Sequence, residues 1–192
     1  MEPIGILKDG QIYDLQTALA LNIQGVEIKA DDSKESLDIL RHSCAHMMAQ
    51  AIKELYPEAK FFVGPVVKEG FYYDFKVESK ISDEDLPAIE KKMKEIADRK
   101  LPITRHETTK EEFYEKFKND ELKQAVLKNI KDDTLTIYKQ GDFEDLCRGP
   151  HLPNTRMIRS FKLTRVAGAY LGGDEKNEMI TRIYGIAFFD KQ

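Results

Sequence analysis

Two short motifs, far apart in the chain, place the strongest constraint on its fold. The first is His42-x-x-x-His46, and the second is Asp145-x-Cys147-x-x-x-His151. A spacing of four puts two side chains one turn apart on one face of a helix, so the first motif predicts a helical pair. The Gly-Pro step inside the second motif breaks a helix and favours a strand that runs into a loop. We therefore expect a helix and a loop to form the two walls of one site.

The helix that carries the histidines is expected from about Ser33 to about Tyr56. Asp32 is expected to cap it, with Glu35 reciprocating three residues later. One narrow apolar stripe predicts its core face, and this stripe contains Leu37, Leu40, Cys44, Met48, Ile52 and Leu55. At about 100° per residue both histidines lie nearly opposite this stripe. They are therefore expected to face a ligand or another chain segment rather than the core.

The other patterns mix strands and helices without a regular β-α-β alternation. Strands are expected at 61–63, 70–75, 135–139, 161–171 and 179–189, and helices after Ser82–Asp85, after Thr109 and at 121–129. This order predicts an α+β domain with a mainly antiparallel sheet around the histidine-bearing helix. Residues 1–32 show only a short hairpin, 4–7 with 11–13, so residues 33–192 are expected to form the main domain.

Composition excludes several classes of protein. With 192 residues, 41% hydrophobic and 33% charged, the chain is typical of a globular protein with one sizeable core. No apolar run approaches the roughly 18 residues of a membrane span, and Met1-Glu2-Pro3 does not begin a signal peptide. We expect a cytoplasmic protein with no membrane partner. The two cysteines, one in the core stripe and one in the site motif, do not indicate a disulfide.

A basic segment follows the second motif, although the whole chain has a net charge of −4. Between residues 148 and 165 there are no acidic residues, and the basic ones are Arg148, Arg156, Arg159, Lys162 and Arg165. Such a strip beside a site predicts contacts with the phosphates of a nucleic acid. The alternative is a solvated, charged loop.

Three kinds of chemistry fit the paired motifs. In a zinc site, His42, His46, Cys147 and His151 would supply four ligands of suitable type. In a thiol nucleophile site, Cys147 would act with a histidine base. In a hydrolytic site without metal, His42 or His46 would act as general base on water, Asp145 would orient that histidine, and a lysine would offset the developing charge. The spacing alone leaves all three open.

The strings RHSCAH (41–46), GFYYD (70–74), DLCRGPH (145–151) and AGAY (167–170) closely resemble the editing domain of bacterial threonyl-tRNA synthetases. The likeness covers nearly all of residues 33–192. Related alanyl editing domains share the histidine and cysteine skeleton but typically carry Gly-Thr where this chain has Gly149-Pro150. The resemblance implies hydrolysis of the ester of seryl-tRNA for threonine, with the acceptor end of that tRNA as partner.

By the same resemblance, the functional residues are His42, His46, Lys123, Asp145, Cys147 and His151. It also implies that editing needs no metal or other cofactor, although the four possible zinc ligands keep zinc as an alternative. The family usually begins with a ubiquitin-like domain, which here is expected to be absent or reduced to the hairpin.

The chain ends at Lys191-Gln192, before any segment that could bind ATP. We therefore expect ATP, magnesium and homodimer contacts to belong to a catalytic part beyond it. Two other interpretations are a free-standing editing protein and a zinc-stabilised RNA-binding module.

Overall fold

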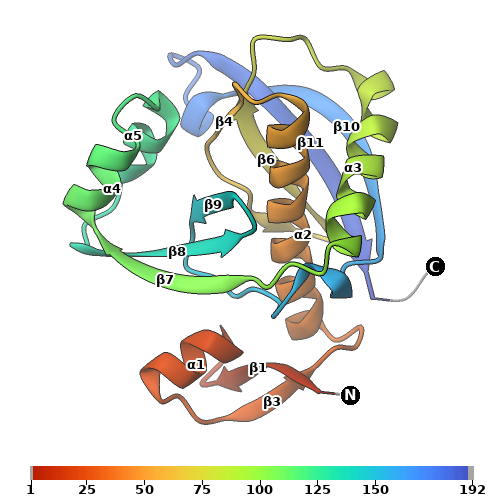
Figure 1. Ribbon diagram of the computed structural model, residues 1–192, viewed down its shortest axis with the longest axis vertical. Helices are drawn as coiled ribbons and strands as arrows, with labels where there is room; N and C mark the ends of the chain where they lie inside the picture. Colours follow the sequence, from red (N-terminus) through yellow and green to blue (C-terminus); the bar gives the residue numbers. More distant parts are fainter. Residues whose placement is uncertain (1, 190–192) are drawn as a thin grey trace.

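The central helix α2 (Lys34–Leu55) runs through the middle of the molecule (Figure 1). The structure is a computed structural model that describes residues 2–189, so the predicted boundary at Lys191-Gln192 lies outside the described residues. The helix has the predicted extent, but Asp32 does not cap it. Ser33 is the extended residue next to the first turn, and its hydroxyl accepts from Ser36 N at 3.4 Å. The predicted capping box was therefore placed one residue too early.

The core around α2 is wider than the predicted stripe. Ile39, Met47 and Ala51 lie outside that stripe and are fully buried, whereas Leu55 is 37% exposed. The reason is that other elements cover α2 on several sides: a large sheet, the helix α3 (Leu86–Asp98) and a smaller sheet. A narrow stripe is therefore the wrong description of this helix. No helix within residues 2–189 combines the length and apolar character needed to cross a membrane.

The large sheet has the strand order β10-β11-β6-β4, with β5 paired to β6, and every pairing is antiparallel. Its strands are β4 (Lys60–Phe61), β5 (Val66–Val67), β6 (Gly70–Lys76), β10 (Ser160–Tyr170) and β11 (Met179–Phe188). Alternate residues of β6, namely Phe71, Tyr73 and Phe75, are buried against α2. The predicted α+β class with a mainly antiparallel sheet is confirmed.

The smaller sheet lies on another side of α2 and has the order β7-β8-β9. Its strands are β7 (Thr104–Thr109), β8 (Thr134–Gln140) and β9 (Phe143–Leu146), and all pair antiparallel. Two helices between β7 and β8 are α4 (Lys110–Lys116) and α5 (Glu121–Lys128). They close a separate apolar cluster formed by Phe113, Leu127, Leu135 and Ile137. This arrangement brings β9 and α5 toward the histidine face of α2.

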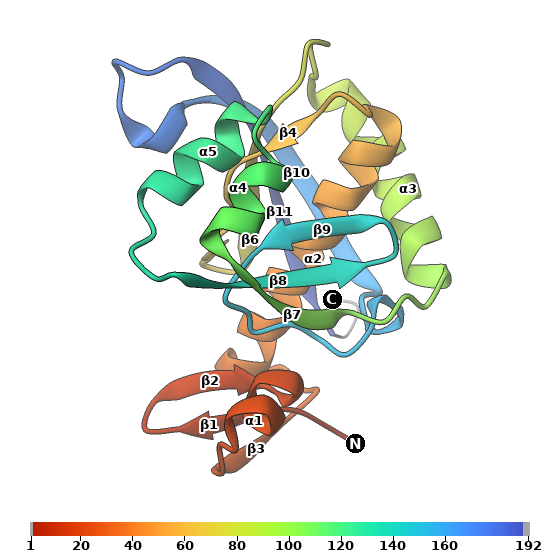
Figure 2. The same ribbon diagram turned by 60° about the vertical axis from the view of Figure 1, so that its left-hand side comes forward.

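The N-terminal unit is larger than the predicted hairpin. The hairpin β1 (Pro3–Lys8) and β2 (Gln11–Asp14) is present, but α1 (Leu15–Leu21) and β3 (Val26–Lys29) complete a three-stranded sheet with a helix. Figure 2 shows this unit at one end of α2. Two of its residues, Ile4 and Ile28, belong to the same core as α2. The missed helix had local signals, since Asp14 caps its start and Asn22 has the left-handed conformation at its end.

Candidate functional site

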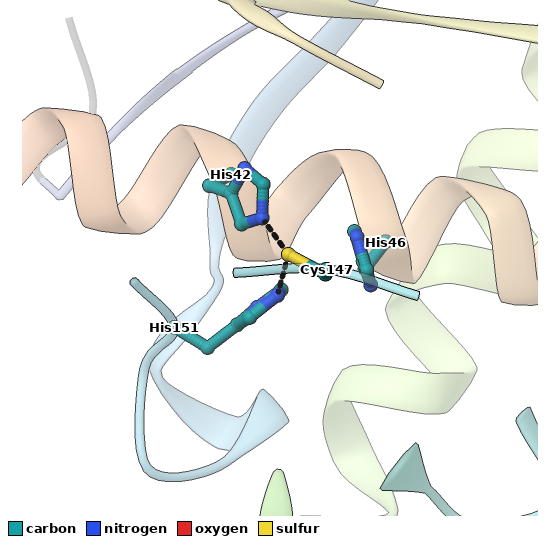
Figure 3. A group of neighbouring side chains, drawn as sticks. All are labelled: His42, His46, Cys147 and His151. Atoms are coloured by element: carbon teal, nitrogen blue, oxygen red, sulfur yellow. Dashed lines mark hydrogen bonds between the residues drawn. The ribbon is translucent and has the colours of Figure 1, made fainter. Parts of the chain in front are cut away.

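The four predicted histidine and cysteine side chains meet where the loop after β9 crosses α2 (Figure 3). They are His42 and His46 from the helix and Cys147 and His151 from the loop, and their ligand atoms all lie within 4.8 Å of one another. The helix supplies one wall and the loop the other, as the two motifs predict. The site is deeply placed, because His46 is 4% and His151 is 2% exposed.

Cys147 lies at the centre of this cluster. Its Sγ is 2.7 Å from His42 Nε2 and 3.4 Å from His151 Nε2. The sulfur also accepts a hydrogen bond from Gly149 N at 3.1 Å. Gly149 has a φ of 80°, in the left-handed region that favours glycine, and so turns the chain sharply after the cysteine. This local turn directs both Cys147 and His151 toward α2.

Ser43 orients His151, a role that the sequence did not reveal. Its Oγ lies 3.0 Å from His151 Nδ1 and accepts from Leu152 N at 2.8 Å. Because Nδ1 is held by the hydroxyl, Nε2 is the ring nitrogen that faces Cys147. Ser43 lies inside the first motif, but a serine beside a histidine carries no signal of this contact.

A buried ion pair adjoins the cluster. Lys123 from α5 donates to one carboxylate oxygen of Asp145 in β9, and the Tyr73 hydroxyl donates to the other. All three side chains are almost fully buried. The Tyr73 ring also lies 5.9 Å from the ring of His46, which connects the pair to the histidines. The structure thus places Lys123 and Asp145 beside the predicted site, and it adds Tyr73.

Burial sets the charge state of these groups. Desolvation lowers the pKa of His42 to about 4 and lowers the pKa of His46 and of His151 well below the ordinary value. The three imidazoles are therefore neutral near pH 7 and able to accept a proton. Burial lowers the pKa of Lys123 to about 8 and raises that of Asp145, so the pKa values of the ion-paired groups approach each other.

The same physical cause acts on the thiol. Burial raises the pKa of Cys147 above its ordinary value, and the Gly149 amide only partly opposes this effect. A protonated thiol is a weak nucleophile, so a cysteine nucleophile is the least favoured of the three chemistries. A bound zinc ion would change this balance, because a coordinating thiol is deprotonated.

The basic segment does not form one uncompensated strip. Arg159 pairs with Asp98 at 2.5 Å, and Lys162 lies 3.4 Å from Glu90. Arg165 stacks over the ring of Tyr184 at 4.2 Å, Arg156 is exposed, and Arg148 is 87% exposed and 3.6 Å from Asp132. The acidic partners come from other parts of the chain. The segment therefore contains no acidic residue of its own, but in the folded protein acidic side chains lie beside it. Of these five basic residues, only Arg148 is next in sequence to a residue of the cluster, Cys147.

A hollow of about 320 Å³ reaches the cluster from the side of Cys147. Strands β8 and β9 and the end of α5 surround it, and its lining includes Arg148, Asp132, Thr136 and Ile130. A larger hollow of about 790 Å³ lies between α3 and β10, where Arg159 and Lys162 line it. Neither hollow is lined by a clustered histidine, but Cys147 lines the first and no residue of the cluster lines the second. The first hollow is therefore the one that adjoins the site.

Comparison with known proteins agrees with this geometry. Residues 135–184 match the family described as "Threonyl and Alanyl tRNA synthetase second additional domain". The chain is 64% identical over 191 residues to a threonine–tRNA ligase of Campylobacter jejuni and to one of Helicobacter hepaticus, covering 100% of this chain in each case. It is 72% identical over 162 residues, 84% of this chain, to a threonine–tRNA ligase of Campylobacter lari.

The matches cover 31%, 32% and 27% of these three enzymes, so the chain spans about a third of the length of the curated relatives. The family match contains Asp145, Cys147 and His151, while the helix histidines and Lys123 lie outside it. The fold adds those residues to the same site. Residues 135–184 therefore match the threonyl and alanyl tRNA synthetase second additional domain, and the whole chain is similar to a part of bacterial threonine–tRNA ligases.

Proposed function

We propose that this chain is a proofreading deacylase that hydrolyses the ester between serine and the tRNA for threonine. The observation that carries the proposal is the meeting of neutral imidazoles with a buried lysine–carboxylate pair at one site, beside a hollow. Neutral imidazoles can take a proton from water, and a lysine can offset negative charge on an oxygen. The match to that domain family supports the choice of an aminoacyl-tRNA as substrate.

The need for such a site follows from the size of the two amino acids. A synthetic pocket for threonine can reject serine only through one missing methyl group, which is worth about 1 to 3 kcal/mol. A second site that admits serine and excludes the larger threonine removes the remaining errors. Threonylation itself, with ATP and magnesium, is proposed to belong to the rest of a longer synthetase. The alternative arrangement is a free-standing protein that edits in trans.

In the proposed reaction a water oxygen attacks the ester carbonyl carbon while an imidazole of the α2 pair accepts a proton. The bond between that carbon and the ribose oxygen then breaks, and the ribose oxygen receives a proton, leaving serine and free tRNA. His42 is the imidazole closest to Cys147, which borders the hollow, so we assign it the proton transfer. His46 lies behind it, toward Tyr73.

Lys123 is proposed to stabilise the oxyanion that forms at the carbonyl oxygen when water attacks. Its ammonium group already contacts Asp145, so the carboxylate and the Tyr73 hydroxyl determine where the positive charge lies. Because burial lowers the pKa of Lys123 to about 8, the same group can also release a proton near neutral pH. The Asp145 carboxylate is in addition a suitable partner for the ammonium group of the substrate.

The tRNA partner is proposed to approach along the side that carries Arg148. This arginine adjoins Cys147 and lines the same hollow, so its guanidinium can contact a phosphate of the acceptor end. The other basic residues, Arg156, Arg159, Lys162 and Arg165, are proposed as more distant phosphate contacts. Three of them already have acidic or aromatic partners, and tRNA would have to compete for those.

A zinc-stabilised RNA-binding module is the second candidate, since one observation favours it: the close group of His42, His46, Cys147 and His151. The donor types fit zinc, and Ser43 supplies the outer contact that zinc-binding histidines usually make. In a tetrahedral site nitrogen and sulfur ligands lie about 3.5 Å apart, so the 2.7 Å between His42 and Cys147 would have to widen. Four protein ligands would give the closed shell of a structural zinc.

The deciding experiment measures hydrolysis of two substrates, seryl-tRNA and threonyl-tRNA, both made with the tRNA for threonine. We expect the seryl ester to be hydrolysed about 10 to 200 times faster than the threonyl ester, which is the discrimination that one methyl group allows. Hydrolysis of both esters at one rate, or of neither at high protein concentration, would refute the proposal. In the second case, a stoichiometric zinc content would support the RNA-binding module.

A further inference from the structure

Asp14, at the end of β2, is a buried carboxylate whose partners lie in the wall of the histidine site. Its side chain belongs to the N-terminal unit and is 2% exposed. One oxygen accepts from Thr17 N at 2.8 Å and caps α1. The other oxygen accepts from His151 N at 2.9 Å and from the Tyr138 hydroxyl at 2.5 Å. A buried carboxylate needs such partners, so these contacts fix the loop relative to the N-terminal unit.

The contacts of Asp14 hold His151 at two points. One is direct and holds the backbone, and the other passes through Tyr138, whose ring lies 4.4 Å from the imidazole. Ser43 holds Nδ1 of the same imidazole. With its backbone, ring face and Nδ1 all held, His151 is left with Nε2 directed at Cys147.

The chain passes very close to Asp14 at this point. A Cβ atom on Gly149 would lie 2.9 Å from the Asp14 carboxylate and 2.5 Å from the Tyr138 hydroxyl. Such close packing transmits a displacement of Asp14 to the loop, because a close-packed interior leaves no gap to absorb it. The loop that carries His151 therefore packs directly against Asp14, at the end of β2.

We propose that Asp14 is a positioning residue for His151, which makes the N-terminal unit a working part of the hydrolytic site. Asp14 does not touch the reacting atoms in this proposal. It acts by keeping the loop and the Tyr138 ring in place, so that His151 Nε2 and Cys147 face the α2 histidines. The catalytic consequence rests on the proposed function, whereas the positioning of His151 can be measured without it.

The test compares three variants of the purified protein. Asp14→Ser retains a side chain that can cap α1 but is too short to reach His151. Tyr138→Phe removes only the hydroxyl that donates to Asp14. The matched control is Gln16→Ala, because Gln16 also ties the N-terminal unit to the rest of the chain, through Arg105 N at 2.7 Å and Ile103 O, without contacting His151.

Two readouts separate positioning from simple loosening of the N-terminal unit. For Asp14→Ser we expect faster exchange of the His151 amide, shifted imidazole nitrogen resonances, and kcat for seryl-tRNA about 10- to 100-fold lower with KM within about twofold. Tyr138→Phe should show smaller changes of the same kind. Gln16→Ala should resemble wild type in both readouts.

Wild-type His151 signals in Asp14→Ser would overturn the proposal, as would equal changes in Gln16→Ala. If the wild-type protein hydrolyses no aminoacyl-tRNA, the proposed function fails, and the amide exchange and resonances still decide whether Asp14 positions His151. Circular dichroism and thermal unfolding of each variant identify one that does not fold, in which case Tyr138→Phe decides the question.

Discussion

Nε2 of His42 lies 2.7 Å from Sγ of Cys147, so the central helix and the loop after β9 are in direct contact within the site. The two groups are at hydrogen-bonding distance, and burial keeps the imidazole neutral and the thiol protonated. A thiol and a neutral imidazole at this distance stabilise each other without a metal. The same four donors could also hold zinc if this contact opened.

The first prediction concerns metal content. Because the thiol is protonated and already in contact with His42, we expect purified protein to contain less than one zinc per chain and deacylation to resist a chelator. Elemental analysis before and after chelation measures the content, and the seryl-tRNA assay measures activity. One tightly held zinc per chain, removed together with activity, would contradict the metal-free mechanism and favour a metal-dependent one.

The second prediction separates the two roles of Lys123. Lys123→Met leaves the buried Asp145 carboxylate without its cation, so we expect a loss of about 3 to 5 kcal/mol in the free energy of unfolding. The double variant Lys123→Met/Asp145→Asn removes both charges and should recover most of that loss. Denaturant unfolding measures both.

Activity should not follow stability in these variants. Both lack the ammonium group, so we expect hydrolysis to fall by about 100-fold or more in each. An active double variant would show that Lys123 has only a structural role.

The third prediction concerns pH and His42. Well above about pH 6.5, the ordinary pKa of histidine, the imidazole is neutral in folded and unfolded chains, so its contribution to stability is complete. As the pH falls toward 4, His42 becomes protonated in the unfolded chain but stays mostly neutral in the folded chain, because its pKa in the folded protein is about 4. The free energy of unfolding should therefore fall with pH across this range, by on the order of 2 kcal/mol for this half-buried residue.

The matched variant for this measurement is His42→Gln. The raised pKa of Asp145 acts in the opposite direction at acid pH, so the wild-type curve alone mixes the two effects. The difference between wild type and His42→Gln isolates the histidine and should shrink as the pH falls from 7 to 4. A difference that does not change with pH would mean that His42 is freely protonated in the folded protein.

The fourth prediction concerns tRNA binding by the basic segment. The variant Arg156→Ala/Arg159→Ala should weaken binding and reduce the salt slope by roughly 0.7 to 0.9 for each phosphate that is no longer neutralised. The control Lys8→Ala/Lys29→Ala removes the same charge from exposed positions on the N-terminal sheet. Equal effects in both double variants would indicate only a general charge effect, and no change in the first would make the segment a solvated loop.

Local patterns along the chain were enough to predict the histidine and cysteine parts of the site, whereas Lys123 was predicted only through the family resemblance. The spacing of His42 and His46 defines one helix face, and the Gly-Pro step after Cys147 requires a turn, because both rules act between near neighbours in sequence. The α+β class and most strands could be predicted for the same reason. The capping residue was misplaced by one, since Asp31, Asp32 and Ser33 are all good caps and only the backbone conformation selects among them.

What surrounds those parts was settled only by folding. The packing of the chain covers the histidine face of α2, brings Lys123 to Asp145 and Tyr73, and lets acidic residues elsewhere neutralise part of the basic segment. It also brings Asp14 to the loop of His151. These contacts join residues that are distant in the chain, and periodicity cannot report them because it describes only which side a residue faces and not what packs against that side.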